Sequence, residues 1–277
     1  MNATVSELLG PKRVRRGGPA PVYDAGSDNS EHGSSRPTFR PSAFFAPRGE
    51  RVAVRLEYPH FLINFKTYDG TYAEEALSYA ETVEAVAEET GASYAVAPQT
   101  VDLRLVAEHT SLPVVAQSVD AAEPGRETGG ILPEAVAEAG ADAVLVDHPE
   151  APDTLADAAT EIRRCRDLGL DTILCVESVE MGRAALSLEP DCLLFENPAD
   201  IATGNALPQT NPELVEEFVA TVEAADSRTK VMVGGGVSTA ADVARAFELG
   251  ADAAGAASAA VQATDRRAWL EAVSDAL

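Results

Sequence analysis

The feature that most constrains the fold is a regular alternation of short apolar runs and amphipathic stretches, which begins at Phe61. Such an alternation is typical of repeated strand-helix units around a parallel sheet. The expected strands are residues 61–65, 94–97, 114–117, 143–146, 172–176, 192–195, 230–233 and 252–256. The expected helices are residues 73–89, 100–109, 133–139, 153–168, 178–188, 211–225, 239–249 and 265–276. Eight strands and eight helices in this order predict an α/β protein with a closed (β/α)8 barrel.

Glycines after four of these helices support the assignment. Gly91, Gly140, Gly169 and Gly250 each stand where a helix ends, a position that favours a left-handed backbone. The chain has 277 residues, 45% of them hydrophobic, which is enough for one barrel-sized domain.

The charge of the chain changes where this pattern begins. Residues 1–55 contain nine Lys or Arg and five Asp or Glu, whereas the remainder contains 12 basic and 40 acidic residues. Residues 1–55 are also rich in Gly, Pro, Ser and Arg and have no apolar periodicity, so we expect a disordered extension before a catalytic barrel domain at 56–277. The basic cluster at residues 12–16 suits an interaction arm, a passive extension or a translation start assigned too far upstream.

The acidic, lysine-poor composition indicates a halophilic cytoplasmic protein, because molar salt screens its self-repulsion. The same charge argues against nucleic acid as a partner. No apolar run approaches the roughly 20 residues that cross a bilayer, so no membrane contact is expected. Cys165, Cys175 and Cys192 lack metal-ligand spacing and are expected to be buried, reduced thiols.

Chemically useful side chains stand at the carboxyl ends of three expected strands, the face where barrel enzymes work. Asn64 and Lys66 end the first strand and, by alternation, both point into the barrel mouth. His148 follows the fourth strand, with Glu150 nearby, and Glu196 ends the apolar run of the sixth strand. The alternatives are a lysine snorkelling outward, a structural histidine and a carboxylate on a solvated rim.

A glycine-rich loop follows the seventh strand. Residues 234–239 read GGGVST, and Ala257 and Ser258 follow the eighth strand. Glycines let several backbone N–H groups point inward, and a following helix amino terminus adds positive potential, so this pair of loops is suited to phosphate. These loops indicate phosphate binding, but they do not identify the reaction.

Together these segments resemble the archaeal type of the triosephosphate isomerase family. The likeness is carried by INFKTY at 63–68, VAPQTVDLR at 96–104, VVAQSVD at 114–120, TGGILPEAV at 128–136, DHPE at 147–150, FENPADIATG at 195–204 and GGGVST at 234–239. The resemblance implies a TIM barrel that interconverts glyceraldehyde 3-phosphate and dihydroxyacetone phosphate through an enediolate, with no metal and no cofactor.

The resemblance also implies a role for each residue. Glu196 is similar to the proton acceptor and His148 to the electrophile, while Asn64 and Lys66 resemble the pair that binds substrate and stabilises the oxyanion. The remaining matches are Ile201 and Gly204 as lid residues, and Gly236, Ala257 and Ser258 as the phosphate cradle. Thr128 resembles a threonine that reaches into a neighbouring subunit, which implies a homodimer or homotetramer.

Five positions depart from the family pattern. They are Pro149 after the histidine, Ser118, Asn197 at the lid hinge, Ala202 in the lid and Ala259 after Ser258. These departures leave open a catalytically weak or silent paralogue that binds a phosphorylated metabolite. A different phosphate-binding barrel enzyme, such as an aldolase or a synthase, is the third hypothesis.

Overall fold

Eight parallel strands form the central sheet of the computed structural model, which describes residues 55–197, 205–225 and 228–277. Of the expected disordered extension, only Arg55 lies within the described residues. The strands are β1 (His60–Asn64), β2 (Tyr94–Ala97), β3 (Val115–Ala116), β4 (Ala143–Val146), β5 (Asp171–Val176), β6 (Cys192–Phe195), β7 (Lys230–Val233) and β8 (Ala253–Ala256). They follow the order β2-β1-β8-β7-β6-β5-β4-β3, and a parallel bridge between Val96 and Val114 joins the two ends. The predicted (β/α)8 barrel is confirmed.

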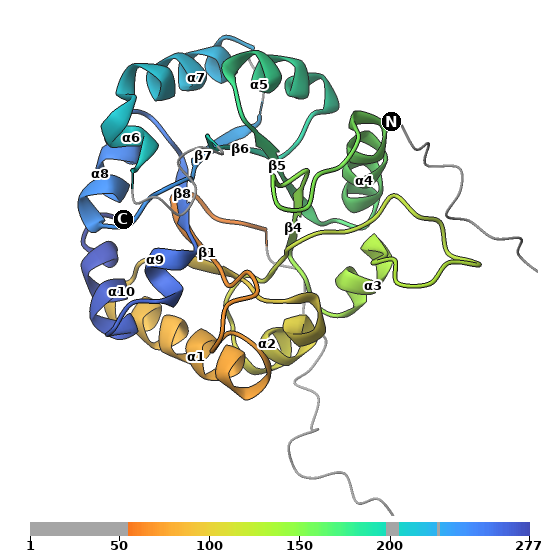
Figure 1. Ribbon diagram of the computed structural model, residues 1–277, viewed down its shortest axis with the longest axis horizontal. Coiled ribbons are helices and arrows are strands. Elements are labelled where there is room, and N and C mark those ends of the chain that lie inside the picture. Colours follow the sequence, from red (N-terminus) through yellow and green to blue (C-terminus); the bar gives the residue numbers. More distant parts are fainter. Residues whose placement is uncertain (1–54, 198–204, 226–227) are drawn as a thin grey trace, which may run out of the picture. The chain divides into compact units, whose positions relative to one another are not determined.

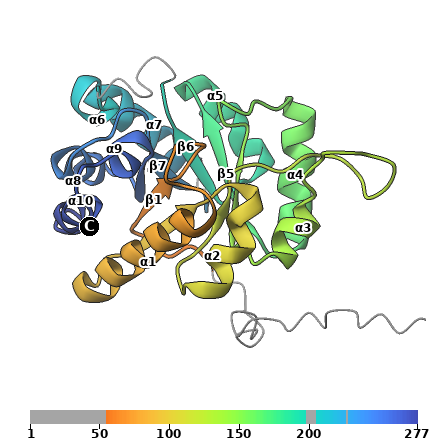
Figure 2. The same cartoon turned by 60° about the horizontal axis from the view of Figure 1, so that its bottom comes forward.

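Helices surround the strands, and Figures 1 and 2 show them as an outer ring. The larger ones are α1 (Ala73–Thr90), α2 (Leu103–His109), α3 (Pro133–Glu138), α4 (Leu155–Asp167), α5 (Val179–Ala185), α7 (Pro212–Ala224), α8 (Ala240–Glu248) and α10 (Arg266–Ser274). Shorter turns are η3 (Thr100–Asp102), η4 (Leu186–Leu188), α6 (Leu207–Thr210) and α9 (Ser258–Val261). Among the described residues, no helix is long and apolar enough to cross a membrane.

Side-chain alternation along the strands divides the apolar residues into two cores. Leu62, Leu145, Ile173, Leu194 and Met232 belong to one buried cluster, which fills the barrel. Their sequence neighbours face the helices in a second cluster that includes Phe61, Ile63, Leu193, Phe195 and Val231. Both faces of each strand are therefore buried, which explains why the strands appear in the sequence as short continuous apolar runs.

The expected elements differ from the observed ones mainly at their ends. β1 starts at His60, so this histidine lies in the strand rather than before it. The helix expected at 100–109 is divided into η3 and α2, and the stretch 178–188 into α5 and η4. The turns α6 and α9 were not predicted, because four residues are too short to show a helical period. Gly91, Gly140, Gly169 and Gly250 do adopt a left-handed backbone, and all three cysteines are buried and free.

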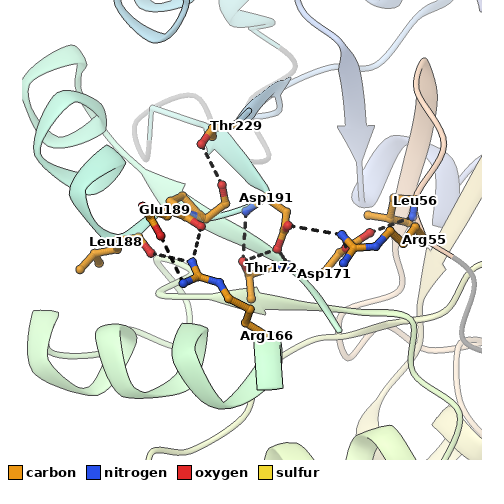
Figure 3. Close-up of polar contacts among 10 residues, drawn as sticks. Arg55, Leu56, Arg166, Asp171, Thr172, Leu188, Glu189, Asp191 and Thr229 are labelled. Atoms are coloured by element: carbon orange, nitrogen blue, oxygen red, sulfur yellow. Dashed lines mark hydrogen bonds and ion pairs between the residues drawn. The ribbon is translucent and has the colours of Figure 1, made fainter. Parts of the chain in front are cut away.

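The chain enters the barrel at its amino-terminal face (Figure 3). Arg55 Nη1 lies 2.9 Å from Asp171 Oδ1, and the Leu56 N–H donates to Asp171 Oδ2 at 2.9 Å. Leu56 is buried in the interior core. Asp191 accepts hydrogen bonds from the backbone N–H and the hydroxyl of Thr172, which ties β5 to β6. These contacts hold Leu56 in the interior core at this end of the barrel, while Asn64, His148 and Glu196 line a cavity at the opposite end.

Candidate active site

The carboxyl end of β1 presents Asn64 and Lys66 to one cavity. Both side chains line it, whereas Phe65 between them is buried in the outer core, as alternation predicts. Lys66 adopts a φ of 45°, a left-handed conformation that lysine rarely takes. Its N–H donates to Asn64 Oδ1 at 2.9 Å, and its Nζ lies 2.9 Å from Glu150 Oε2. This unusual backbone and the ion pair with Glu150 direct the ammonium group of Lys66 toward the barrel mouth.

His148 follows β4 in a tight turn. The Glu150 N–H donates to His148 Nδ1 at 3.0 Å, so Nδ1 is the acceptor and the ring proton of the neutral form is on Nε2. Burial lowers the pKa of His148, the nearby Lys66 ammonium lowers it further, and Glu150 partly opposes the shift. The imidazole is therefore neutral at neutral pH, with an Nε2–H available to donate.

Two aspartates hold the turn that carries His148. The Asp147 N–H donates to Asp153 Oδ2 at 3.0 Å, and the Asp153 N–H donates to Asp147 Oδ1 at 2.8 Å. The Ala151 N–H donates to the His148 carbonyl at 2.7 Å. These bonds span both sides of the histidine and restrict its position relative to β4.

Glu196 follows β6, where its N–H donates to the Val176 carbonyl at 3.1 Å. Burial raises the pKa of its carboxyl to about 6, against the lowering effects of Lys66 and of a hydrogen bond from the Gly235 backbone. A Cβ placed on Gly234 would lie 2.1 Å from Glu196 Oε1. The carboxylate therefore occupies space that only a glycine at position 234 leaves free.

The ammonium, the imidazole and the carboxylate meet at a single cavity of about 280 Å³. His148 Nε2 lies 3.8 Å from Glu196 Oε2. The side chains of His148, Glu196 and Lys66 are 8%, 13% and 15% exposed, so each is largely withdrawn from solvent and yet reachable from the cavity. Three residues predicted from distant parts of the sequence are thus brought together.

The loops after β7 and β8 form another wall of this cavity. Gly236, Ala257 and Ser258, the predicted cradle residues, all line it, and Gly235 and Gly236 have positive φ values. The start of α8 offers fewer free N–H donors to a phosphate than expected, because the Ser238 and Thr239 N–H groups donate to the Asp242 carboxylate. An anion at this wall would therefore depend on the glycine loop and on the start of α9 rather than on α8.

Some predicted residues fall elsewhere. Ile201, Gly204 and the altered lid position Ala202 lie outside the described residues. Thr128 is exposed in the loop before α3, which projects away from the barrel (Figures 1 and 2). A hydrogen bond from the Ile131 N–H to Asp120 Oδ2 closes the base of this loop.

Sequence reasoning missed three polar residues at the site. Tyr68 and Gln262 line the cavity, and Gln117 lines an adjoining hollow with Lys66 and His148. Gln117 follows β3 at the same barrel face, so its place at a strand end could have identified it. Within the described ranges, no cluster of three His, Cys, Asp or Glu side chains could hold a metal ion.

Comparisons with known proteins agree with this geometry. The family model described as "Triosephosphate isomerase" matches residues 59–274. A protein of that name from Methanocaldococcus jannaschii is 40% identical over 202 residues, which cover 73% of this chain and 92% of the relative. One from Methanopyrus kandleri is 40% identical over 222 residues, covering 79% and 98%. One from Methanothermus fervidus is 37% identical over 216 residues, covering 78% and 97%.

Proposed function

The chain belongs to the triosephosphate isomerase family, and we propose that Lys66, His148 and Glu196 carry out the family's interconversion of glyceraldehyde 3-phosphate and dihydroxyacetone phosphate. The observation that carries this proposal is the arrangement of the three side chains around one cavity large enough for a three-carbon phosphate.

Glu196 acts as the base. Its carboxylate removes a proton from the carbon beside the substrate carbonyl, which gives an enediolate, and the resulting carboxylic acid returns a proton to the neighbouring carbon. The hydroxyl proton of the enediolate moves from one oxygen to the other, which exchanges the carbonyl and the hydroxyl. A pKa of about 6 suits both steps, because the group is ionised near neutral pH and still accepts a proton readily. Gly234 and Gly235 support this role by leaving space for the carboxylate and by donating a backbone hydrogen bond to it.

His148 stabilises the oxygen on which negative charge develops. Its Nε2–H is available to donate because Nδ1 is occupied by the Glu150 N–H. The Lys66 ammonium and the Asn64 amide line the same cavity and add positive potential and a donor. Donors fixed in a site with little water stabilise developing charge strongly, because they need no reorganisation when the charge appears.

The wall formed by the loops after β7 and β8 receives the phosphate. Gly236, Ala257 and Ser258 provide backbone N–H groups there, and the alanine at position 259 also retains its backbone N–H. By the family resemblance, Ile201 and Gly204 are lid residues that would exclude water from the bound enediolate, and both lie outside the described residues. The same resemblance supports self-association through the loop of Thr128, as a homodimer or homotetramer. The acidic, lysine-poor composition supports a cytoplasmic, halophilic setting.

The comparisons favour the isomerase over a silent paralogue, since relatives named triosephosphate isomerase are 35–40% identical over most of this chain. The departures at Pro149, Ser118 and Ala259 leave the ammonium, imidazole and carboxylate of the site unchanged. An aldolase or a synthase would not require this combination of Lys66, His148 and Glu196 on three strand ends.

The experiment is to follow glyceraldehyde 3-phosphate turnover by purified protein in molar potassium chloride and, in parallel, to measure binding of 2-phosphoglycolate. Turnover together with binding is the expected result. Binding without turnover would support the silent paralogue. The absence of both binding and turnover would contradict the proposed substrate.

A further inference from the structure

Gln117 joins the ends of three strands at the active-site face. Its Nε2 lies 2.9 Å from the carbonyl oxygen of Ala97, 3.2 Å from that of Lys66 and 3.3 Å from Asn64 Oδ1. Ala97 ends β2, Asn64 ends β1, and Lys66 follows β1. All three partners are acceptors, so the nitrogen end of the Gln117 amide must face them.

The contact with Asn64 determines which end of the Asn64 amide faces the cavity. Asn64 Oδ1 accepts hydrogen bonds from the Lys66 N–H and from Gln117 Nε2. A carbonyl oxygen has two lone pairs, and both are engaged by these donors. The amide is thereby oriented so that its Nδ2–H donors remain for a ligand in the cavity that Asn64 lines.

The contact with Lys66 supports a costly backbone conformation. A left-handed backbone is unfavourable for a residue other than glycine and persists only where neighbouring groups hold it. The Lys66 N–H is bound to Asn64 Oδ1, and the Lys66 carbonyl is bound to Gln117 Nε2. Gln117 therefore contacts one end of this backbone directly and the other end through Asn64.

From these contacts we infer that Gln117 is a positioning residue for the isomerisation, acting through Lys66 and Asn64. It keeps the Lys66 ammonium over the cavity and the Asn64 donors directed at the substrate oxygen. This inference rests on the proposed function, but its structural part concerns binding and can be tested without turnover.

The test compares Gln117→Met, which keeps the length and removes the donors, with Gln117→Glu, which places an oxygen opposite three acceptor oxygens. Gln209→Met is the matched control, because exposed Gln209 Nε2 donates to the Ala241 carbonyl at 3.2 Å away from the site. We expect kcat/KM to fall about 10- to 100-fold in Gln117→Met and further in Gln117→Glu, with an unfolding temperature close to that of the control.

A double-mutant cycle separates positioning from general structure. The dissociation constant of 2-phosphoglycolate is measured for wild type, Gln117→Met, Lys66→Met and the double variant. We expect Gln117→Met to weaken binding at least about 5-fold in the wild-type background and less than about 2-fold in the Lys66→Met background. Equal losses in both backgrounds, or a Gln117→Met protein that binds and turns over like wild type, would overturn the inference. Inactive wild-type protein would count against the proposed function, while the binding cycle would still decide the role of Gln117.

Discussion

His148 Nε2 and Glu196 Oε2 lie 3.8 Å apart, too far for a direct hydrogen bond, and both face the same cavity. The donor and the base are therefore not paired with each other, and both can contact a molecule bound beside them in the cavity. A carbonyl oxygen placed near Nε2 brings the adjacent carbon within reach of the carboxylate. This relationship explains why neutral histidine and ionised glutamate can act on neighbouring atoms of one substrate.

The pH dependence of kcat/KM should report the ionisation of Glu196. Burial raises its pKa to about 6 from the ordinary value of 4.5, so the base form is lost as the pH falls through 6. Burial and the Lys66 ammonium lower the pKa of His148, so its protonation is shifted to lower pH. We expect kcat/KM to rise with pH up to about 6 and then to level off, measured between about pH 4.5 and 8.5. A midpoint at the ordinary value, or a rate that falls as pH rises through 6, would contradict this assignment.

Gly234→Ala should misplace the base. The added methyl would lie 2.1 Å from Glu196 Oε1, so the carboxylate has to move. We expect kcat to fall about 10-fold or more, since small displacements of a catalytic group are costly. Gly125→Ala is the control, because its methyl would meet nothing closer than 3.9 Å. Equal kcat values for the two variants would show that the space beside Glu196 is not restrictive.

Most strands, and the meeting of Lys66, His148 and Glu196 at one barrel face, were predictable from the sequence for a physical reason. Strands buried on both faces, such as β4 and β6, appear as continuous apolar runs, and polar residues at their carboxyl ends are exceptional. The contacts of Gln117 were not predictable, because they depend on how far the carboxyl ends of β1, β2 and β3 extend relative to one another. The left-handed backbone of Lys66 gave no local signal either, since no glycine marks it.

Glu161 should make stability depend on pH in an unusual direction. Its carboxyl is buried, and neither oxygen is hydrogen-bonded to any of the described residues. Burial, and then Asp153, Asp157, Asp120 and Asp147, raise its pKa to about 8. Because the folded pKa exceeds the unfolded value of 4.5, the contribution of Glu161 is greatest below pH 4.5 and is lost as pH rises toward 8. We expect the wild type to lose stability on the order of 3 kcal/mol across this window.

The measurement for Glu161 is thermal unfolding of Glu161→Gln and wild type at pH 5 and 8.5. The variant should lose less stability than wild type over this interval. Glu216→Gln, which changes an exposed glutamate on α7, should behave like wild type. Equal losses of stability between pH 5 and 8.5 in all three proteins would show that ionising Glu161 does not destabilise the folded state.

Potassium chloride should stabilise the barrel. Residues 56–277 contain 40 acidic and 12 basic residues, so repulsion opposes folding in dilute buffer and is screened when the Debye length falls to about 3 Å at 1 M salt. We expect the unfolding temperature to rise from low salt to molar potassium chloride. An unfolding temperature that is constant or falls over this range would contradict the halophilic interpretation.

The most direct test of the central claim is the rate of triose phosphate isomerisation by Glu196→Gln in molar potassium chloride. Glu177→Gln is the matched control, because Glu177 is an exposed glutamate directly after β5, the strand beside β6. The account predicts that Glu196→Gln lowers kcat about 10²- to 10⁴-fold, since it removes the base, while 2-phosphoglycolate still binds and Glu177→Gln turns over like wild type. A Glu196→Gln protein with wild-type kcat would contradict it.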